Sequence, residues 1–170
     1  MSIAYREQLA ELAQTLHAER QLLEHLLFKL IEARLVLAAD EARFLPHAMR
    51  EVEAIVDRVR FGEGHRRLAV QNLANAIGEP EERITLKFLI GWAPEPFRLM
   101  FQEHQDHFRR LATEIEQASL DNRRLAGLAV QSLSDTLGTL LGSQDPGTYT
   151  PTGGHGRQTA VLPTHIDEVL

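Results

Sequence analysis

The sequence predicts an all-α protein, an antiparallel bundle of long, coiled-coil-like helices followed by a flexible C-terminal tail. Residues 5–40 contain no glycine or proline, and leucine recurs there at every seventh position. This spacing is typical of a helix that packs along a narrow stripe. Residues 142–170, in contrast, hold five of the 11 glycines and three of the seven prolines. Such a composition does not form a packed element, so we expect this tail to be disordered.

The first predicted helix covers residues 5–40 and carries two apolar rows. One row consists of Leu9, Leu16, Leu23, Leu30 and Leu37, and the other of Tyr5, Leu12, Glu19, Leu26 and Ala33. At about 1.5 Å per residue this helix is roughly 50 Å long. A helix of this length needs partners to cover its stripe. Neighbouring helices of the same chain or a second chain would serve, so a homodimer is possible.

The second predicted helix begins near Asp40, or just before Pro46, because proline fits the first turn of a helix. Its apolar residues are Met49, Val52, Val56 and Val59, and then Leu68, Leu73, Ala76 and Ile77. Between these two groups lie Gly62 and Gly64, and each costs about 1 kcal/mol relative to alanine inside a helix. We favour one helix with a weak centre over two helices joined by a loop. Gly78 is expected to end it, since Pro80 follows.

The third predicted element, residues 83–90, is short and apolar. A strand would suit its alternation, but no partner strand is evident, so we expect a short helix over the end of the bundle. Pro94 and Pro96 are then expected in the first turn of the last helix, with Trp92 covering the bundle end. The rows of that helix are Phe97, His104, Leu111, Ala118 and Leu125, and Phe101, Phe108, Ile115 and Asn122.

The last helix changes its apolar face after Asn122 and is expected to end at Gly142. The new face consists of Ala126, Val130, Leu133, Leu137, Leu140 and Leu141. Its offset from the earlier rows means that the helix bends or that these residues contact a partner. We therefore divide the chain into a bundle domain, residues 1–141, in which residues 123–141 bind a partner, and a tail, residues 142–170.

Composition excludes several classes of protein. The chain has no cysteine, which removes disulfides and thiolate chemistry. Its net charge of −6 argues against binding to nucleic acid, which requires a positive surface. No apolar run has the length of a membrane span, and charges occur at the N-terminus where a signal peptide is apolar. We therefore expect a cytoplasmic protein.

The histidines do not form a recognisable metal or catalytic site. A di-iron bundle needs Glu-x-x-His pairs, and none of the eight histidines has a glutamate three residues before it. His104 and His107 could share a metal with Glu103, but burial of His104 in its row is the simpler interpretation. We expect no metal, no cofactor and no enzymatic activity. The basic cluster Arg58, Arg60, Arg66 and Arg67 is interpreted as a solvated face paired with Glu51, Glu53 and Asp57.

Several stretches together resemble the FlgN family of flagellar export chaperones. They are "LLEHLLFKLIEARLVLAADEARFL", "REVEAIVDRVR", "LANAIGEPEERITLKFL", "APEPFRLMFQEH" and the later "TYTPTGG". The resemblance covers most of residues 5–150, and "FGEGH" departs from it, where the family keeps better helix formers.

The resemblance implies a chaperone that binds the C-terminal helices of hook-associated flagellar proteins. It would prevent their premature assembly and deliver them to the export gate at the membrane. The face from Ala126 to Leu141 is the candidate client site, and Tyr149 is a candidate contact with the gate. A coiled-coil adaptor or dimeric scaffold without a secretion role is the alternative.

Overall fold

The computed structural model describes the backbone of residues 4–140 and the side chains of residues 5–131. Leu141, Tyr149 and the predicted tail lie outside the described residues. The side chains of Leu133, Leu137 and Leu140 lie outside them too, although the backbone of these three residues is helical.

The described chain consists of four α-helices and two short 3₁₀ turns, with no strand between residues 4 and 140. The helices are α1 (Ala4–Ala38), α2 (Leu45–Ile77), α3 (Leu86–Trp92) and α4 (Phe97–Leu140), and the turns are Ala42–Phe44 and Glu81–Arg83. The all-α prediction is confirmed, and the short apolar piece predicted at residues 83–90 is α-helical from Leu86 onward.

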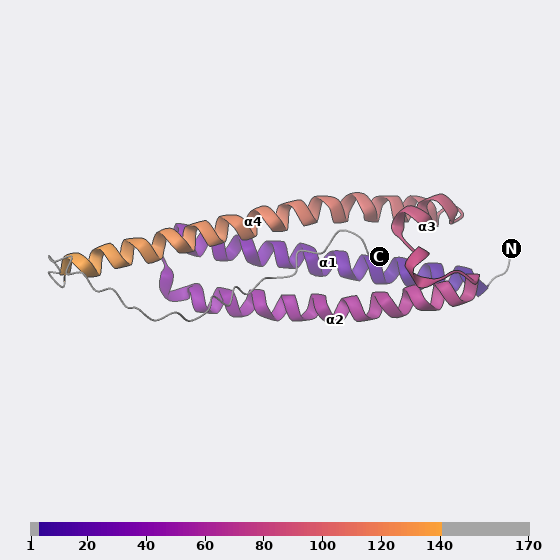
Figure 1. Ribbon diagram of the computed structural model, residues 1–170, viewed down its shortest axis with the longest axis horizontal. Helices are drawn as coiled ribbons and strands as arrows, with labels where there is room; N and C mark the ends of the chain where they lie inside the picture. Colours follow the sequence, from indigo (N-terminus) through magenta and orange to yellow (C-terminus); the bar gives the residue numbers. More distant parts are fainter. Residues whose placement is uncertain (1–3, 141–170) are drawn as a thin grey trace, which may run out of the picture.

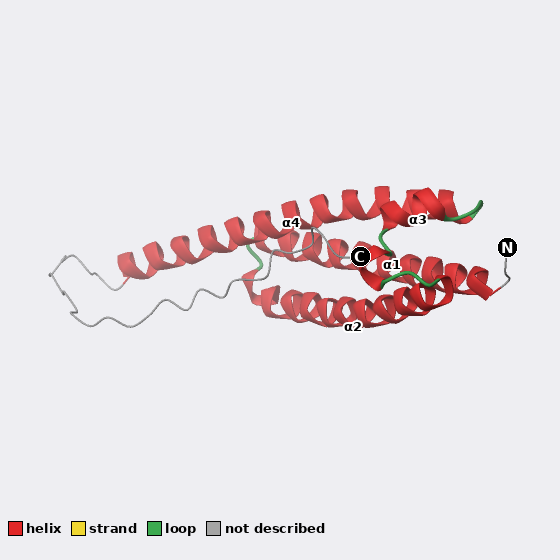
Figure 2. Cartoon of the chain, turned by 45° about the vertical axis from the view of Figure 1, so that its right-hand side comes forward, coloured by secondary structure: helices red, strands yellow, loops and turns green. Residues whose placement is uncertain are grey.

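The three long helices form an elongated bundle (Figures 1 and 2). Helix α2 runs antiparallel to α1, and α4 runs antiparallel to α2. Helices α1 and α4 are therefore parallel, with Tyr5 beside Trp92 at one end and Leu30 bonded to Asn122 towards the other. Helix α1 packs against both α2 and α4, so it is the element shared by the two long interfaces. A homodimer stays a prediction.

The core follows the two rows predicted for α1. Leu9, Leu12 and Leu16 join α2, α3 and α4 in one cluster, which includes the fully buried Phe101. A second cluster lies further along the bundle, around Leu26, where α1 meets α2 and α4. The heptad spacing of α1 thus identified the buried side of the helix correctly.

Of the two predicted starts of α2, the one near Asp40 is wrong and the one just before Pro46 is confirmed. The helix begins at Leu45 with proline in its first turn, and the chain before it forms a 3₁₀ turn. It is continuous through Gly62 and Gly64, as we favoured. Gly78 ends it in the left-handed conformation at φ 73°, where its N–H donates to the Ala74 carbonyl.

The buried face of α2 agrees with the predicted one in part, because Val52 and Leu73 are buried and Val56, Val59 and Ile77 pack against the two core clusters. Met49 and Leu68 are 41% and 54% exposed, and Ala76 is exposed. The row that faces α1 is Val52, Ile55, Val59, Gly62, Arg66, Ala69 and Leu73. Gly62 and Arg66 interrupt this row in the middle, and apolar spacing wrongly added Met49, Leu68 and Ala76 to the buried face.

Helix α3 and the start of α4 close one end of the bundle. The Phe88 N–H donates to the Thr85 hydroxyl at 3.1 Å, which caps α3. Pro94 and Pro96 precede α4, which begins at Phe97 and not at the prolines themselves. Trp92 stacks on Phe88 and contacts the Tyr5 ring, yet it remains 39% exposed and covers the end only in part.

Candidate partner-binding segment of helix α4

Helix α4 is longer than the bundle that it joins. It has 44 residues, whereas α1 has 35. Asn122 lies level with Leu30, to which it is bonded, but α4 continues for 18 residues beyond that level and α1 for only eight. The difference is about 15 Å of helix. Figures 1 and 2 show α4 projecting past the end of α1, and we call residues 127–140 the α4 extension.

Polar contacts mark the level where α4 leaves α1. The Asn122 side-chain amide donates to the Leu30 main-chain carbonyl at 2.9 Å. One residue earlier, Asp121 accepts from Arg34 at 3.3 Å and from Gln117 at 3.0 Å. Directional bonds between two helices allow only one alignment, so this group fixes the register of α4 on α1.

Side chains become exposed directly after this level. Leu125 and Ala126 are half-buried, whereas Leu128 is 54% and Val130 69% exposed. A Cβ added at Gly127 would meet no atom within 4 Å. The described start of the α4 extension therefore faces open space and not the bundle.

The predicted partner-binding residues share one side of α4. Ala126 is half-buried and Val130 is exposed. The helical backbone places Leu133, Leu137 and Leu140 at the same three- and four-residue spacing. Leu141 and Tyr149 lie outside the described residues. The rotation of the apolar face at this point agrees with the end of packing against α1.

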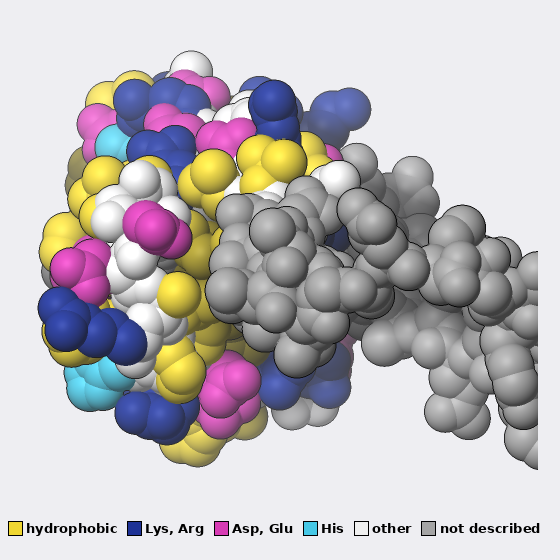
Figure 3. Space-filling model, turned by 90° about the vertical axis from the view of Figure 1, so that its left-hand side faces the viewer, with side chains coloured by type: hydrophobic (Ala, Val, Ile, Leu, Met, Phe, Trp, Pro, Cys, Tyr) yellow, Lys and Arg dark blue, Asp and Glu magenta, His cyan; other side chains and the backbone are white. Residues whose placement is uncertain are grey.

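Further apolar side chains at this end were missed by the sequence analysis. Leu35 near the end of α1 is 59% exposed, Phe44 before α2 is 52% exposed, and Leu128 belongs to α4 itself. Figure 3, which looks onto this end of the molecule, shows hydrophobic side chains at its surface. Leu35 and Leu128 lie outside the rows predicted for their helices, and Phe44 precedes α2. An apolar residue outside such a row was the feature of the sequence that could have identified them.

The histidines of α4 have structural surroundings. His104 is 5% exposed, and its ring stacks on Phe108 with 6.1 Å between centroids. Burial lowers the pKa of His104, and the nearby Arg20 lowers it further. His107 is half-buried and shares a hydrogen bond of 3.0 Å with Arg110. No group of three metal-binding side chains is found in the described part of the chain.

The basic cluster has only part of its predicted partners. Arg60 pairs with Asp57 at 3.4 Å, as expected, but Arg66 lies 3.7 Å from Glu19 of α1. Glu51 binds Lys29 at 2.7 Å instead of an arginine. This hydrogen bond lowers the pKa of Glu51, and bonds to Glu32 and Glu51 raise the pKa of Lys29.

Within residues 4–140, no helix combines the length and the apolarity that a membrane crossing requires. Comparison with family models gave a match to the model described as FlgN protein, over residues 1–157. Comparisons with curated proteins and with solved structures gave no significant match. The family match spans nearly the whole chain and includes the stretches that suggested it, from the first helix to "TYTPTGG". The chain therefore belongs to the FlgN family of flagellar export chaperones.

Proposed function

We propose that this chaperone acts in the cytoplasm on hook-associated flagellar proteins. It binds their C-terminal helices, prevents premature assembly and delivers them to the export gate. The observation that supports this most directly is the α4 extension, which continues past the end of α1 and has Val130 of the predicted face 69% exposed. An apolar helical face that continues past the end of α1 suits an amphipathic client helix.

The expected affinity is that of a reversible complex. Large apolar side chains contribute about 1.5–3 kcal/mol each when fully buried, so the six residues of the face give a gross gain on the order of 10 kcal/mol. Ordering of both partners removes much of this gain. A dissociation constant between micromolar and nanomolar follows, which holds a client and still permits its release.

Delivery to the gate is the second half of the proposal. Tyr149 follows α4 by nine residues in the sequence, so it stays tethered close to a client held on the α4 extension. We propose that Tyr149 contacts the export gate at the membrane. The chaperone needs neither a cofactor nor a catalytic step for this role, because binding and release suffice.

The decisive test is the double substitution Leu133→Asp with Leu137→Asp. Two carboxylates on the proposed face should abolish binding of a C-terminal segment of a hook-associated protein, measured by isothermal titration calorimetry. Helicity by circular dichroism should stay unchanged. The matched control is Leu99→Asp with Leu120→Asp, which alters two leucines of the same helix, 56% and 50% exposed, at the level of the bundle.

The control should bind with wild-type affinity. Loss of helicity in the first variant would show that its leucines belong to the core. Retained client binding by that variant, with the fold intact, would contradict the assignment of the α4 extension as the client site.

A further inference from the structure

The rows by which α1 and α2 face each other are both interrupted at one level. In α1, Glu19 stands between Leu12 and Leu26, at a position that is otherwise apolar. In α2, the interruption is Gly62 and Arg66. Arg66 lies 3.7 Å from Glu19, so the two interruptions meet in space. Both hydrophobic clusters are built from residues on either side of this level, not at it.

Glu19 is buried without a hydrogen-bond partner. It is 6% exposed, and its Oε2 atom is inaccessible to solvent and makes no hydrogen bond within the described residues. The Arg66 Nε atom at 3.7 Å is beyond hydrogen-bonding distance. A buried and poorly paired carboxylate destabilises a fold, and a leucine would fill this position at no such cost. A buried polar group left in this state requires an explanation.

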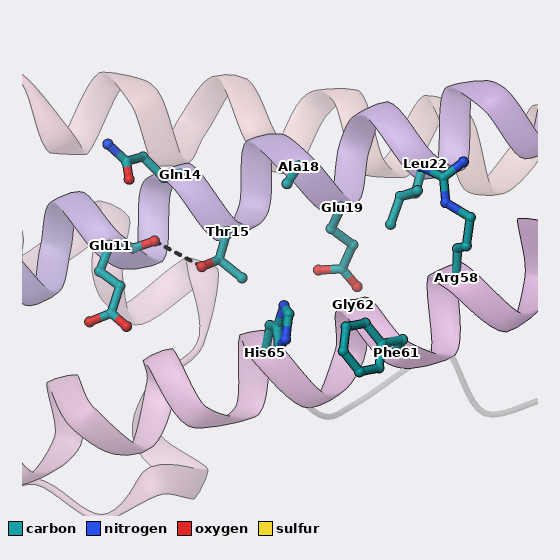
Figure 4. A pocket seen from close by; sticks show the side chains of 10 residues that line it. All are labelled: Glu11, Gln14, Thr15, Ala18, Glu19, Leu22, Arg58, Phe61, Gly62 and His65. Carbon is teal, nitrogen blue, oxygen red and sulfur yellow. Dashed lines mark hydrogen bonds between the residues drawn. The ribbon is translucent and has the colours of Figure 1, made fainter.

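The carboxylate of Glu19 points into a groove of about 420 Å³ (Figure 4). All lining residues belong to α1 and α2: Glu11, Gln14, Thr15, Ala18, Glu19, Leu22, Arg58, Phe61, Gly62 and His65. We call it the Glu19 groove. Figure 4 shows Glu19 directed at Gly62 and His65 across the space between the helices. At Gly62 an added Cβ would meet a Leu22 methyl group at 3.3 Å, so a larger residue would crowd the groove.

The walls of the Glu19 groove favour a planar cation. Phe61 is 70% exposed, and its ring contacts the His65 ring edge-on with 4.6 Å between centroids. A guanidinium group stacks well on an aromatic face and pairs with a carboxylate in two directions. The lining holds two carboxylates, Glu11 and Glu19, and one arginine, Arg58, while Arg66 lies 3.7 Å from Glu19 behind it.

We propose that the Glu19 groove binds an arginine side chain of a client polypeptide, with Glu19 accepting from the guanidinium and Phe61 stacking on it. The client as the source of this arginine rests on the proposed function. The groove lies between α1 and α2 and is separate from the α4 extension. The buried Glu19 weakens the bundle, Gly62 is a poor helix former and Phe61 is 70% exposed, and such departures from good packing gathered around one groove are typical of a functional site.

The test uses the full chain labelled with ¹⁵N and two peptides. One is acetyl-Ala-Ala-Arg-Ala-Ala-amide, and the other carries citrulline, the neutral isostere of arginine. Titration with the arginine peptide should shift the amide signals of Gly62 and Ala18, whereas the citrulline peptide should leave them in place. Glu19→Gln should weaken the fitted Kd at least about tenfold, the loss expected for a charge-assisted hydrogen bond. The control Glu24→Gln makes the same change on α1 outside the groove and should keep the wild-type Kd.

Three results would overturn the proposal. Equal shifts with both peptides would show that charge is not recognised. A wild-type Kd in Glu19→Gln, with unchanged helicity, would show that Glu19 is not the acceptor. A stronger response in Arg157→Gln would assign the groove to the only lysine or arginine that follows residue 140 in this chain, and not to a client.

The proposed arginine site and the proposed chaperone function can be refuted independently of each other. The Leu133→Asp with Leu137→Asp variant should keep the shifts caused by the arginine peptide, because the groove is distant from the α4 extension. Shifts in the groove without any binding of hook-associated proteins would refute the function and leave the cation site standing. For a hook-associated segment, replacement of its arginines by citrulline should weaken binding to wild type and have no effect in Glu19→Gln.

Discussion

Polar residues stand at row positions of the long helices, where an apolar residue would pack better. Glu19 in α1 and His104 in α4 are 6% and 5% exposed, and Asn122 bonds across to α1. Seven-residue spacing placed His104 and Asn122 in the rows of α4, and the structure confirms that position. The structure adds the partners, because which main-chain carbonyl meets Asn122 depends on the register of two helices.

The two buried titratable residues, Glu19 and His104, make opposite contributions to the pH dependence of stability. Burial raises the pKa of Glu19, an effect that Arg66 opposes and Glu63 reinforces. The fold therefore favours the protonated form of Glu19 more strongly than the unfolded chain does. The stabilising contribution of Glu19 is present below its ordinary pKa of 4.5 and is lost as pH rises through the raised value. Burial lowers the pKa of His104, and its contribution is present above 6.5 and is lost as pH falls through the lowered value.

We predict that His104→Leu weakens the acid sensitivity of the fold. In the wild-type protein the free energy of unfolding should fall as pH decreases from about 7 to about 5, since the unfolded chain binds a proton at residue 104 more readily. The variant lacks this proton and should show a smaller fall. Urea unfolding followed by circular dichroism at several pH values measures it.

Replacement of the exposed His65 by glutamine is the control for this experiment and should retain the wild-type slope. An unchanged slope in His104→Leu would mean that other groups control acid unfolding. In that case the buried imidazole would have no measurable share in the pH dependence.

Helix α2 shows which features of one helix can be predicted from its sequence without knowledge of the neighbouring helices. Its ends were set by Pro46 and Gly78, whose backbone preferences are local, and both agree with the structure. Apolar spacing predicted its buried side only in part: Val52, Val59 and Leu73 lie on it, but so do Gly62 and Arg66. Met49 and Leu68 looked like core residues but have no long helix on their side.

The two glycines of α2 should respond differently to alanine. An added Cβ at Gly64 meets nothing within 4 Å, so Gly64→Ala should raise the free energy of unfolding by about 0.5–1 kcal/mol through its helix propensity. At Gly62 the Leu22 methyl group lies 3.3 Å away, so Gly62→Ala should gain less or lose stability. Urea denaturation of both variants beside the wild type measures the difference.

A larger gain at Gly62 than at Gly64 would contradict this geometry. It would show that Leu22 moves aside freely and that the Glu19 groove tolerates a methyl group.

The whole molecule is a helical bundle in which one helix, α4, extends past the end of the others. The last buried residue along the described chain is Ala118 of α4, and Leu128 and Val130 are exposed. Stability and partner binding are therefore expected in different parts of the chain. This view agrees with the proposed division between a folded bundle and a partner-binding segment after residue 122.

We predict that a chain ending at Gln131 retains the stability of the full protein. Both core clusters are intact in it, so the free energy of unfolding should change by less than about 1 kcal/mol, or roughly 4 °C in Tm. Thermal unfolding by calorimetry measures this, and client binding should be lost. A much larger fall in Tm would show that residues 132–170 contribute to the folded bundle.

The sequence by itself determined the helices and the family. Heptad rows, prolines and Gly78 act through local backbone preferences and short-range spacing, which need no knowledge of neighbours. Only the tertiary structure decided that Gly62 and Arg66 belong to the covered side of α2, where α4 leaves α1, and that Glu19 meets Gly62 and Arg66. These features depend on the lengths and registers of three helices relative to one another. The burial of a side chain depends on such an arrangement and cannot be derived from the sequence of a single helix.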